Sequence, residues 1–212
     1  EPGQSNYNIP TLLRLKGPLN FHALEQSFTA LYRRHEALRA IFPIEDGHSV
    51  QIICEPREVQ IPVSDFSEVP EAEREASGLA AAAKEASKPY VMSRPVLRPR
   101  LLRLGEQDHL LLIVTHAVAC DAISTRVLVE ELVTLYGGFA GGQPGKLPSL
   151  RHRYAKALES LQLPPDIENK QLEYWVQRLK DAPALLDLPA DRPRPADQSD
   201  AGARQRILLP KE

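Results

Sequence analysis

Five consecutive apolar residues, "LLLIV" at positions 110–114, are followed by Thr115 and His116. A strand with one face in water alternates apolar and polar residues, whereas a strand covered on both faces is apolar at successive positions. The preceding stretch, "LRPRLLRL" at 97–104, also has the pattern of a strand, and "GEQD" at 105–108 joins the two. The pattern therefore predicts a strand pair whose second member lies inside a sheet covered by helices on both faces, in an α/β (α+β) fold.

Amphipathic and alanine-rich stretches supply the helices for those faces. Asn20 is a predicted N-cap for a helix through about Arg34, and residues 67–87 are rich in Ala and Glu. Residues 122–136 carry a third helical pattern, and 137–149 are predicted to form a loop. The other predicted elements are a strand at 11–17, a hairpin around Asp46-Gly47, a short strand at 59–66, and helices near 150–161 and 166–180.

The composition changes near the end of the chain. From residue 183 onward the sequence is rich in proline and polar residues, and it has no period that would build a core. We therefore expect one mixed-sheet domain over 1–182 and a proline-rich connecting segment over 183–212.

Net charge, apolar runs and cysteine spacing indicate which partners and ligands the chain is not expected to bind. The 212-residue chain has a formal net charge of −2, so no nucleic-acid partner is expected. No apolar run approaches the ~20 residues of a membrane span, and residues 1–10 lack the features of a signal peptide. Cys54 and Cys120 are expected to be free thiols in a reducing cytoplasm. No histidines or cysteines show metal-ligand spacing, so no metal site is expected.

Three long stretches, in order along the chain, carry a family pattern. The first runs from "YNIP" to "RHEALRAIF" and contains Arg34, His35, Glu36 and Arg39; the second is "KPYVMSRPVLRPRLLRLGEQDHLLLIVTH"; the third is "QLEYWVQRLKDAPALLDLPADRPRP". With these stretches the chain resembles the N-terminal lobe of a condensation domain from a nonribosomal peptide synthetase, in the chloramphenicol-acetyltransferase-like superfamily. The resemblance implies a mixed sheet flanked by helices over 1–182. It also implies that 183–212 crosses toward a C-terminal lobe that this sequence lacks.

The family's active-site motif, His-His-x-x-x-Asp-Gly, falls on residues 116–122. His116 and Asp121 match it, but Ala117 stands where the family has its catalytic histidine, and Ala122 stands at the glycine. The resemblance implies that His116 is the structural member of the pair. It also implies that Asp121 is structural and forms an ion pair with Arg39.

The resemblance also implies the substrates and partners. Condensation joins an amine on one carrier protein to a thioester on another, so upstream and downstream carrier proteins are expected as partners. No cofactor is expected to bind directly, because the substrates arrive on phosphopantetheine arms. Alanine can neither accept the amine's proton nor orient the amine. Loss of such a group costs ~10²–10⁴ in rate, or roughly 3–5 kcal/mol of barrier.

Three interpretations of the altered motif remain open. The domain is silent, and docks carriers or spaces its neighbours; or it still transfers acyl groups through His116 or substrate tethering; or Ala117 is an engineered knockout, against which Ala122 argues as a second change. Heterocyclising relatives carry the motif Asp-x-x-x-x-Asp-x-x-Ser here, and this chain matches it only at Asp121 and Ser124. Oxygenase-recruiting relatives carry Arg and Asp at positions 117 and 122, so that partner is not inferred. Cys120 lacks an activating setting and is expected to be a packed thiol.

Overall fold

The structure is a computed structural model that describes residues 5–193, 195–196 and 207–208. The chain divides into two units, Glu1–Gln162 and Leu163–Glu212. The first unit contains the sheet and the packed helices, and the second is described separately below.

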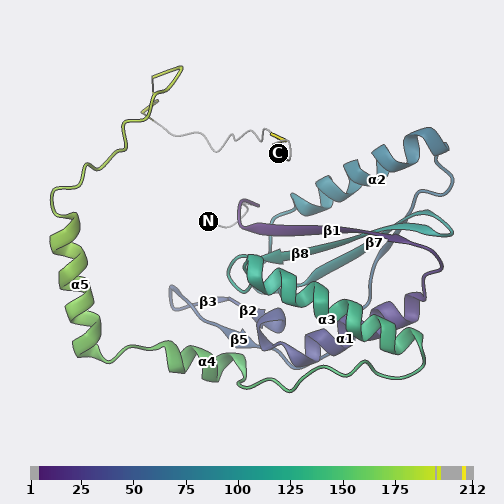
Figure 1. Cartoon of the computed structure of the whole chain (residues 1–212), viewed down its shortest axis with the longest axis horizontal. Helices are drawn as coiled ribbons and strands as arrows, with labels where there is room; N and C mark the ends of the chain where they lie inside the picture. The colour runs from purple at the N-terminus through teal and green to yellow at the C-terminus, as the bar shows by residue number, and fades with distance from the viewer. Residues whose placement is uncertain (1–4, 194, 197–206, 209–212) are drawn as a thin grey trace. The chain divides into compact units, whose positions relative to one another are not determined.

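A four-stranded sheet organises the first unit (Figure 1). Its strands are β1 (Asn8–Lys16), β6 (Val63–Asp65), β7 (Arg98–Gly105) and β8 (Asp108–His116), in the order β1-β8-β7-β6. β8 pairs antiparallel with both β1 and β7, whereas β6 pairs parallel with β7. The sheet is therefore mixed, as predicted, and the strand pair at 97–116 is confirmed.

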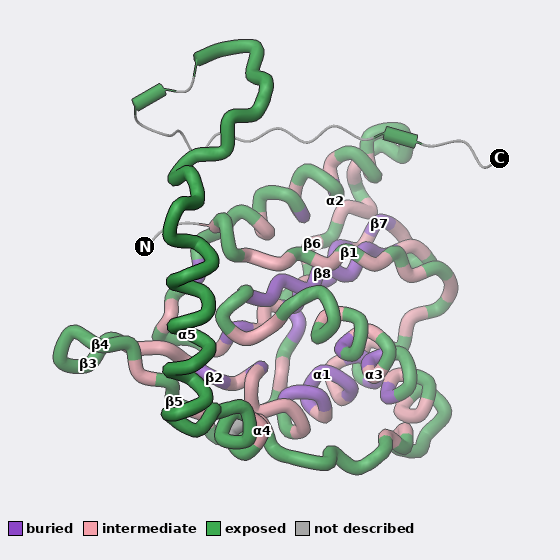
Figure 2. The backbone as a smooth tube through the Cα atoms, turned by 60° about the vertical axis from the view of Figure 1, so that its left-hand side comes forward, coloured by how far each residue is buried: buried purple, intermediate pink, exposed green. Residues whose placement is uncertain are grey.

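β8 is buried along its length because helices cover both faces of the sheet. Every residue from His109 to His116 is buried, and β8 is drawn in the purple of buried residues in Figure 2. Side chains at odd positions, such as Leu111 and Ile113, join the core under α1 (Phe21–Arg34) and α3 (Ala122–Ala140). Those at even positions, such as Leu112, join the core under α2 (Glu71–Ala86).

Local signals position the smaller elements as expected. The Asn20 side chain accepts a hydrogen bond from the Ala23 N–H at 3.0 Å, so the predicted N-cap is confirmed. The predicted hairpin also forms, with positive φ at Asp46 (50°) and Gly47 (79°), as its tight turn requires. The short elements of this region are η1 (Glu36–Arg39), β2 (Ala40–Ile41), β3 (Ile44–Glu45), β4 (His48–Ser49) and β5 (Ile52–Ile53).

α3 continues four residues beyond its predicted end at 136, to Ala140. Gly137 and Gly138, which predicted a loop, are helical. The cause lies in the loop that follows: its residue Gly145 folds back onto the helix, and a Cβ at Gly138 would overlap the Gly145 backbone. The glycine at 138 therefore serves a close approach of two backbones rather than the end of a helix.

The second unit begins at Leu163, and the domain boundary expected at 182 stays a prediction. Its helix α5 (Pro165–Leu179) has no buried residue, whereas α4 (Tyr154–Leu161) belongs to the first unit. The described residues from 163 onward are all exposed. Of the predicted connecting segment at 183–212, residues 194, 197–206 and 209–212 lie outside the described residues. Among the residues described, no helix is long and apolar enough to cross a membrane.

The glycine contact predicts opposite effects for two adjacent substitutions. Gly138→Ala should lower the free energy of unfolding by about 1–3 kcal/mol, because the methyl group must displace the Gly145 backbone. Gly137→Ala meets no atom within 4 Å and should be neutral or raise stability by up to about 1 kcal/mol, through better helix propensity. Urea denaturation of both variants measures the difference, and equal stabilities would contradict the close approach.

Candidate active site

The altered motif forms a turn between β8 and α3. His116 is the last residue of β8, and α3 begins at Ala122. The His116 carbonyl accepts hydrogen bonds from the Ala119 and Cys120 N–H groups at 3.0 and 3.1 Å, and the Ala117 N–H donates to the Tyr7 carbonyl at 2.9 Å. The backbone of the turn is thus held to both the end of β8 and the start of β1.

His116 points into the protein, on the α2 side of the sheet. Its side chain is buried, and its ring packs edge-on against Tyr90, with centroids 5.2 Å apart, and at a tilt against Tyr7. Nδ1 accepts the Val118 N–H at 3.1 Å, so the ring is neutral and carries its proton on Nε2. Burial, and secondarily the charge of Arg98, lower the pKa of His116. These features fit a structural histidine.

Ala117 is the first residue after β8. It is exposed, and so is Ala122 in the first turn of α3. Consecutive residues leaving a strand point to opposite sides, so a side chain at 117 projects away from the core that holds His116. The exposed position directly after β8 therefore carries a methyl group.

The predicted ion pair between Asp121 and Arg39 does not form in this structure. Asp121 is exposed and caps α3: its Oδ1 accepts both the N–H and the hydroxyl of Ser124, each at 2.7 Å, and these bonds lower its pKa. The Arg39 guanidinium donates to the Cys54 carbonyl and lies 3.7 Å from the Glu36 carboxylate. Asp121 thus binds a residue close in sequence. Arg39 contacts one residue close in sequence and one across the short β2–β5 pair.

Glu131 of α3 is the partner that sequence reasoning missed. Its carboxylate accepts from Arg34 Nε at 3.1 and 3.2 Å and lies 2.6 Å from His35 Nε2. Arg34 also donates to the Pro148 carbonyl at 2.7 Å. The signal was present in the sequence, because Glu131 falls at helical spacing with Leu128 and Leu132, where a charge needs a partner. Arg34 and His35 therefore tie the end of α1 to α3.

The α1–α3 side of the turn carries a small apolar cavity. Its volume is about 290 Å³, and its lining includes Leu38, Cys120, Ile123 and Tyr154. Burial raises the pKa of the Cys120 thiol, which therefore remains protonated, as a packed thiol should. In the part of the chain that the structure describes, no three His, Cys, Asp or Glu side chains gather as metal ligands would.

The partly buried cluster of Glu131, Arg34 and His35 predicts a large stability effect with an adjacent control. Glu131→Gln should lower the free energy of unfolding by about 2–4 kcal/mol, because Arg34 and His35 lose their shared anion. Glu130→Gln removes only an exposed contact to Arg126 at 3.7 Å and should change stability by no more than about 0.5 kcal/mol. Denaturant titration compares the two, and similar losses would argue against the cluster.

Comparisons with known proteins agree with the resemblance seen in the sequence. The family model described as the Condensation domain matches residues 1–212. A linear gramicidin synthase of Brevibacillus parabrevis is 41% identical over 214 residues, which cover 100% of this chain and 3% of that protein. The phosphinothricin tripeptide synthetase PhsC of Streptomyces viridochromogenes is 35% identical, with 100% and 20% covered. The chain thus spans a small part of these curated relatives.

Solved structures show the same fold. The X-domain in its complex with OxyB from teicoplanin biosynthesis matches with a TM-score of 0.74 and 27% identity, over 90% of this chain and 42% of that one. The starter condensation domain of rhizomide synthetase RzmA matches with a TM-score of 0.75 at 16% identity, over 86% and 44%. The predicted fold class, a chloramphenicol-acetyltransferase-like lobe with a mixed sheet and flanking helices, is confirmed. The match over the whole chain establishes that this protein belongs to the condensation-domain family.

Proposed function

We propose that this chain is the N-terminal part of a condensation domain that acts within a nonribosomal peptide, or hybrid polyketide–peptide, synthetase and is impaired or silent in amide-bond formation. The observation that carries the proposal is the exposed methyl group of Ala117 directly after the buried, neutral His116. The site keeps its backbone turn and lacks the group that would meet the substrate.

The chemistry explains why that group matters. In condensation, an amine attacks a thioester carbon, the C–N bond forms, the C–S bond breaks, and the amine must lose a proton. A side chain within hydrogen-bond reach of the amine lowers this barrier by accepting the proton or by orienting the amine. A methyl group offers no lone pair, so the exposed position after β8 cannot perform either task.

His116 is a poor substitute for the missing group. Its Nδ1 already accepts the Val118 N–H, its Nε2 carries a proton, and its ring packs between Tyr7 and Tyr90. To act as a base it would have to leave this setting and break the hydrogen bond to the turn. The alternative of continued activity therefore rests on tethering alone, which supplies proximity but no proton acceptor.

The relatives support carrier proteins as partners. The names of the gramicidin and phosphinothricin relatives describe peptide synthetases, and condensation takes both substrates from carriers through phosphopantetheine arms. The chain covers 42–44% of the solved condensation-type chains it matches. A silent domain would keep carrier docking while losing bond formation.

Ala122 supports natural change over an engineered knockout. It is a second departure from the motif, and it lies exposed at the first position of α3. Removing catalysis requires one substitution, at 117, and nothing in the packing around Ala122 demands a companion change.

Restoring the imidazole tests the proposal directly. In a single-turnover assay of the complete parent domain with loaded donor and acceptor carriers, we expect Ala117→His to raise the rate of product formation by about 10²–10⁴-fold. Ala117→His combined with Ala122→Gly should do at least as well. Intact-mass analysis of the carriers measures product. Val118→His places an imidazole at the next, also exposed position and should leave the rate unchanged.

The measured rates of product formation distinguish the interpretations. If the unmodified domain forms product within about tenfold of Ala117→His, the impaired-site proposal is wrong and the reaction does not need this imidazole. If Ala117→His stays inactive while carriers still bind, the domain has a docking role that one residue cannot reverse. Carrier binding, measured in parallel, separates this outcome from a misfolded variant.

A further inference from the structure

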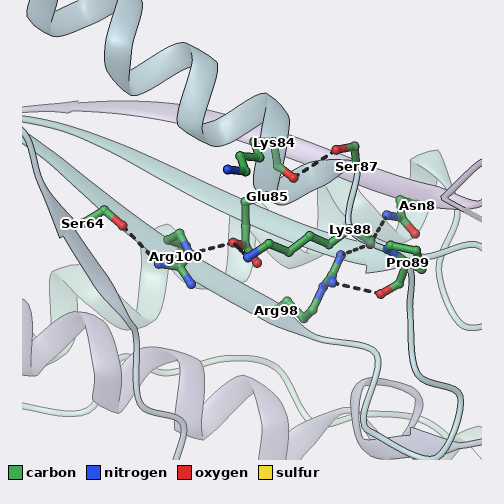
Figure 3. A network of polar contacts seen from close by, with 9 residues as sticks. All are labelled: Asn8, Ser64, Lys84, Glu85, Ser87, Lys88, Pro89, Arg98 and Arg100. Carbon is green, nitrogen blue, oxygen red and sulfur yellow. Dashed lines mark hydrogen bonds and ion pairs between the residues drawn. The ribbon is translucent and has the colours of Figure 1, made fainter. Parts of the chain in front are cut away.

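A polar network joins the end of α2 to the sheet on the His116 side (Figure 3). The Asn8 amide donates to the carbonyls of Ala86 and Lys88 at 2.6 and 2.9 Å. The Arg98 guanidinium donates to the carbonyls of Lys88 and Pro89 at 3.0 and 3.4 Å. These four contacts satisfy carbonyls at and beyond the last turn of the helix. They fix the Arg98 head group beside the segment that leads to Tyr90.

Arg98 and Tyr90 form a stack that ends at His116. The Arg98 guanidinium carbon lies 4.0 Å from the Tyr90 ring centre, a cation–π contact. The His116 ring meets the same Tyr90 ring edge-on, at 5.2 Å between centroids and 76° between planes. Tyr90 itself is held in place, because its hydroxyl lies 2.7 Å from the Val96 carbonyl and 2.5 Å from the Val114 carbonyl.

We propose that Arg98 and Tyr90 are positioning residues for the motif turn: they hold His116 as a neutral hydrogen-bond acceptor, so that its Nδ1 can bind the Val118 N–H and fix the backbone at 117. The inference rests on the proposed function for its catalytic consequence. Its structural part, the state of the His116 ring, stands independently.

The groups that face His116 favour its neutral form. Arg98, on β7, is a fixed cation on the same buried side, so a second positive charge on His116 would be repelled and poorly solvated. Tyr90 is a neutral phenol, because burial raises its pKa to about 12. Tyr7, before β1, is the other aromatic group in contact. On the turn itself, Cys120 is a protonated thiol and the Asp121 carboxylate is bound to Ser124.

Protonation of His116 would release the turn. A protonated Nδ1 donates and cannot accept the Val118 N–H, so this hydrogen bond breaks. Burial and Arg98 lower the pKa of His116, which keeps the turn formed as pH falls toward the pKa of a free histidine. Because the folded-state pKa lies below the unfolded one, the unfolded chain binds the proton first. Stability is therefore full above the unfolded pKa and declines as pH falls through the folded pKa.

Titration of His116 in the complete condensation domain tests the inference. With histidine ring nitrogens labelled, NMR reports both the proton-bearing nitrogen and the pKa, and a His116→Gln variant assigns the signal. At neutral pH the unmodified protein should show an unprotonated Nδ1. Arg98→Met keeps an apolar stem without the charge and should raise the pKa of His116. Arg98→Lys restores the cation and should return the pKa toward its original value.

Arg94→Met is the matched control, because Arg94 is exposed in the segment just before Arg98, and it should leave the His116 pKa unchanged. An unchanged pKa in Arg98→Met, or a protonated Nδ1 in the unmodified protein at neutral pH, would overturn the inference. Circular dichroism of each variant confirms that the fold is retained.

An activity measurement then tests the catalytic consequence. In the Ala117→His background, adding Arg98→Met should shift the acid limb of the rate–pH profile toward higher pH, whereas adding Arg98→Lys should not. If Ala117→His is inactive, the proposed function fails its own test, while the His116 titration still decides this inference. If activity returns and Arg98→Met leaves the acid limb of the rate–pH profile unchanged, Arg98 does not position the turn for catalysis.

Discussion

β8 is covered on both faces, and its burial determines which faces of the sheet α1, α2 and α3 must cover. A strand that is apolar at successive positions is stable only when one layer covers its odd residues and another covers its even residues. α1 and α3 supply the first layer, and α2 supplies the second. β1 and β7 both flank β8 and satisfy its backbone groups, and the sheet is mixed because β6 pairs parallel with β7.

The same alternation decides the state of the candidate active site. His116 continues the even-numbered series of β8, so its side chain lies on the α2 side of the sheet. There its ring packs against Tyr90, and Tyr90 stacks on Arg98. Residue 117 is the first position released from this constraint, and it is exposed. Two adjacent residues, His116 and Ala117, therefore lie in different settings, one buried and one exposed.

Two carboxylates at α3 make their contacts at different depths. Glu131 binds Arg34 and His35 in a largely buried setting between α1 and α3, while Asp121 is used at the surface as a helix cap. A carboxylate at an exposed helix start gains more from nearby N–H groups than from a distant cation. This explains why Asp121 and Arg39, paired in the family pattern, each find a closer partner in this chain.

Local patterns and ordered motifs were enough to predict the three helices that cover the sheet, the strand pair at 97–116, the hairpin at Asp46-Gly47 and the family. Through the family resemblance the sequence also predicts that Ala117 stands at a catalytic histidine, and this stays a prediction. The tertiary structure alone decided the partners of charged groups, the extension of α3 through Gly138, and the division of the chain after Gln162. These features depend on contacts between residues that are far apart in sequence, and periodicity along the chain does not predict such contacts.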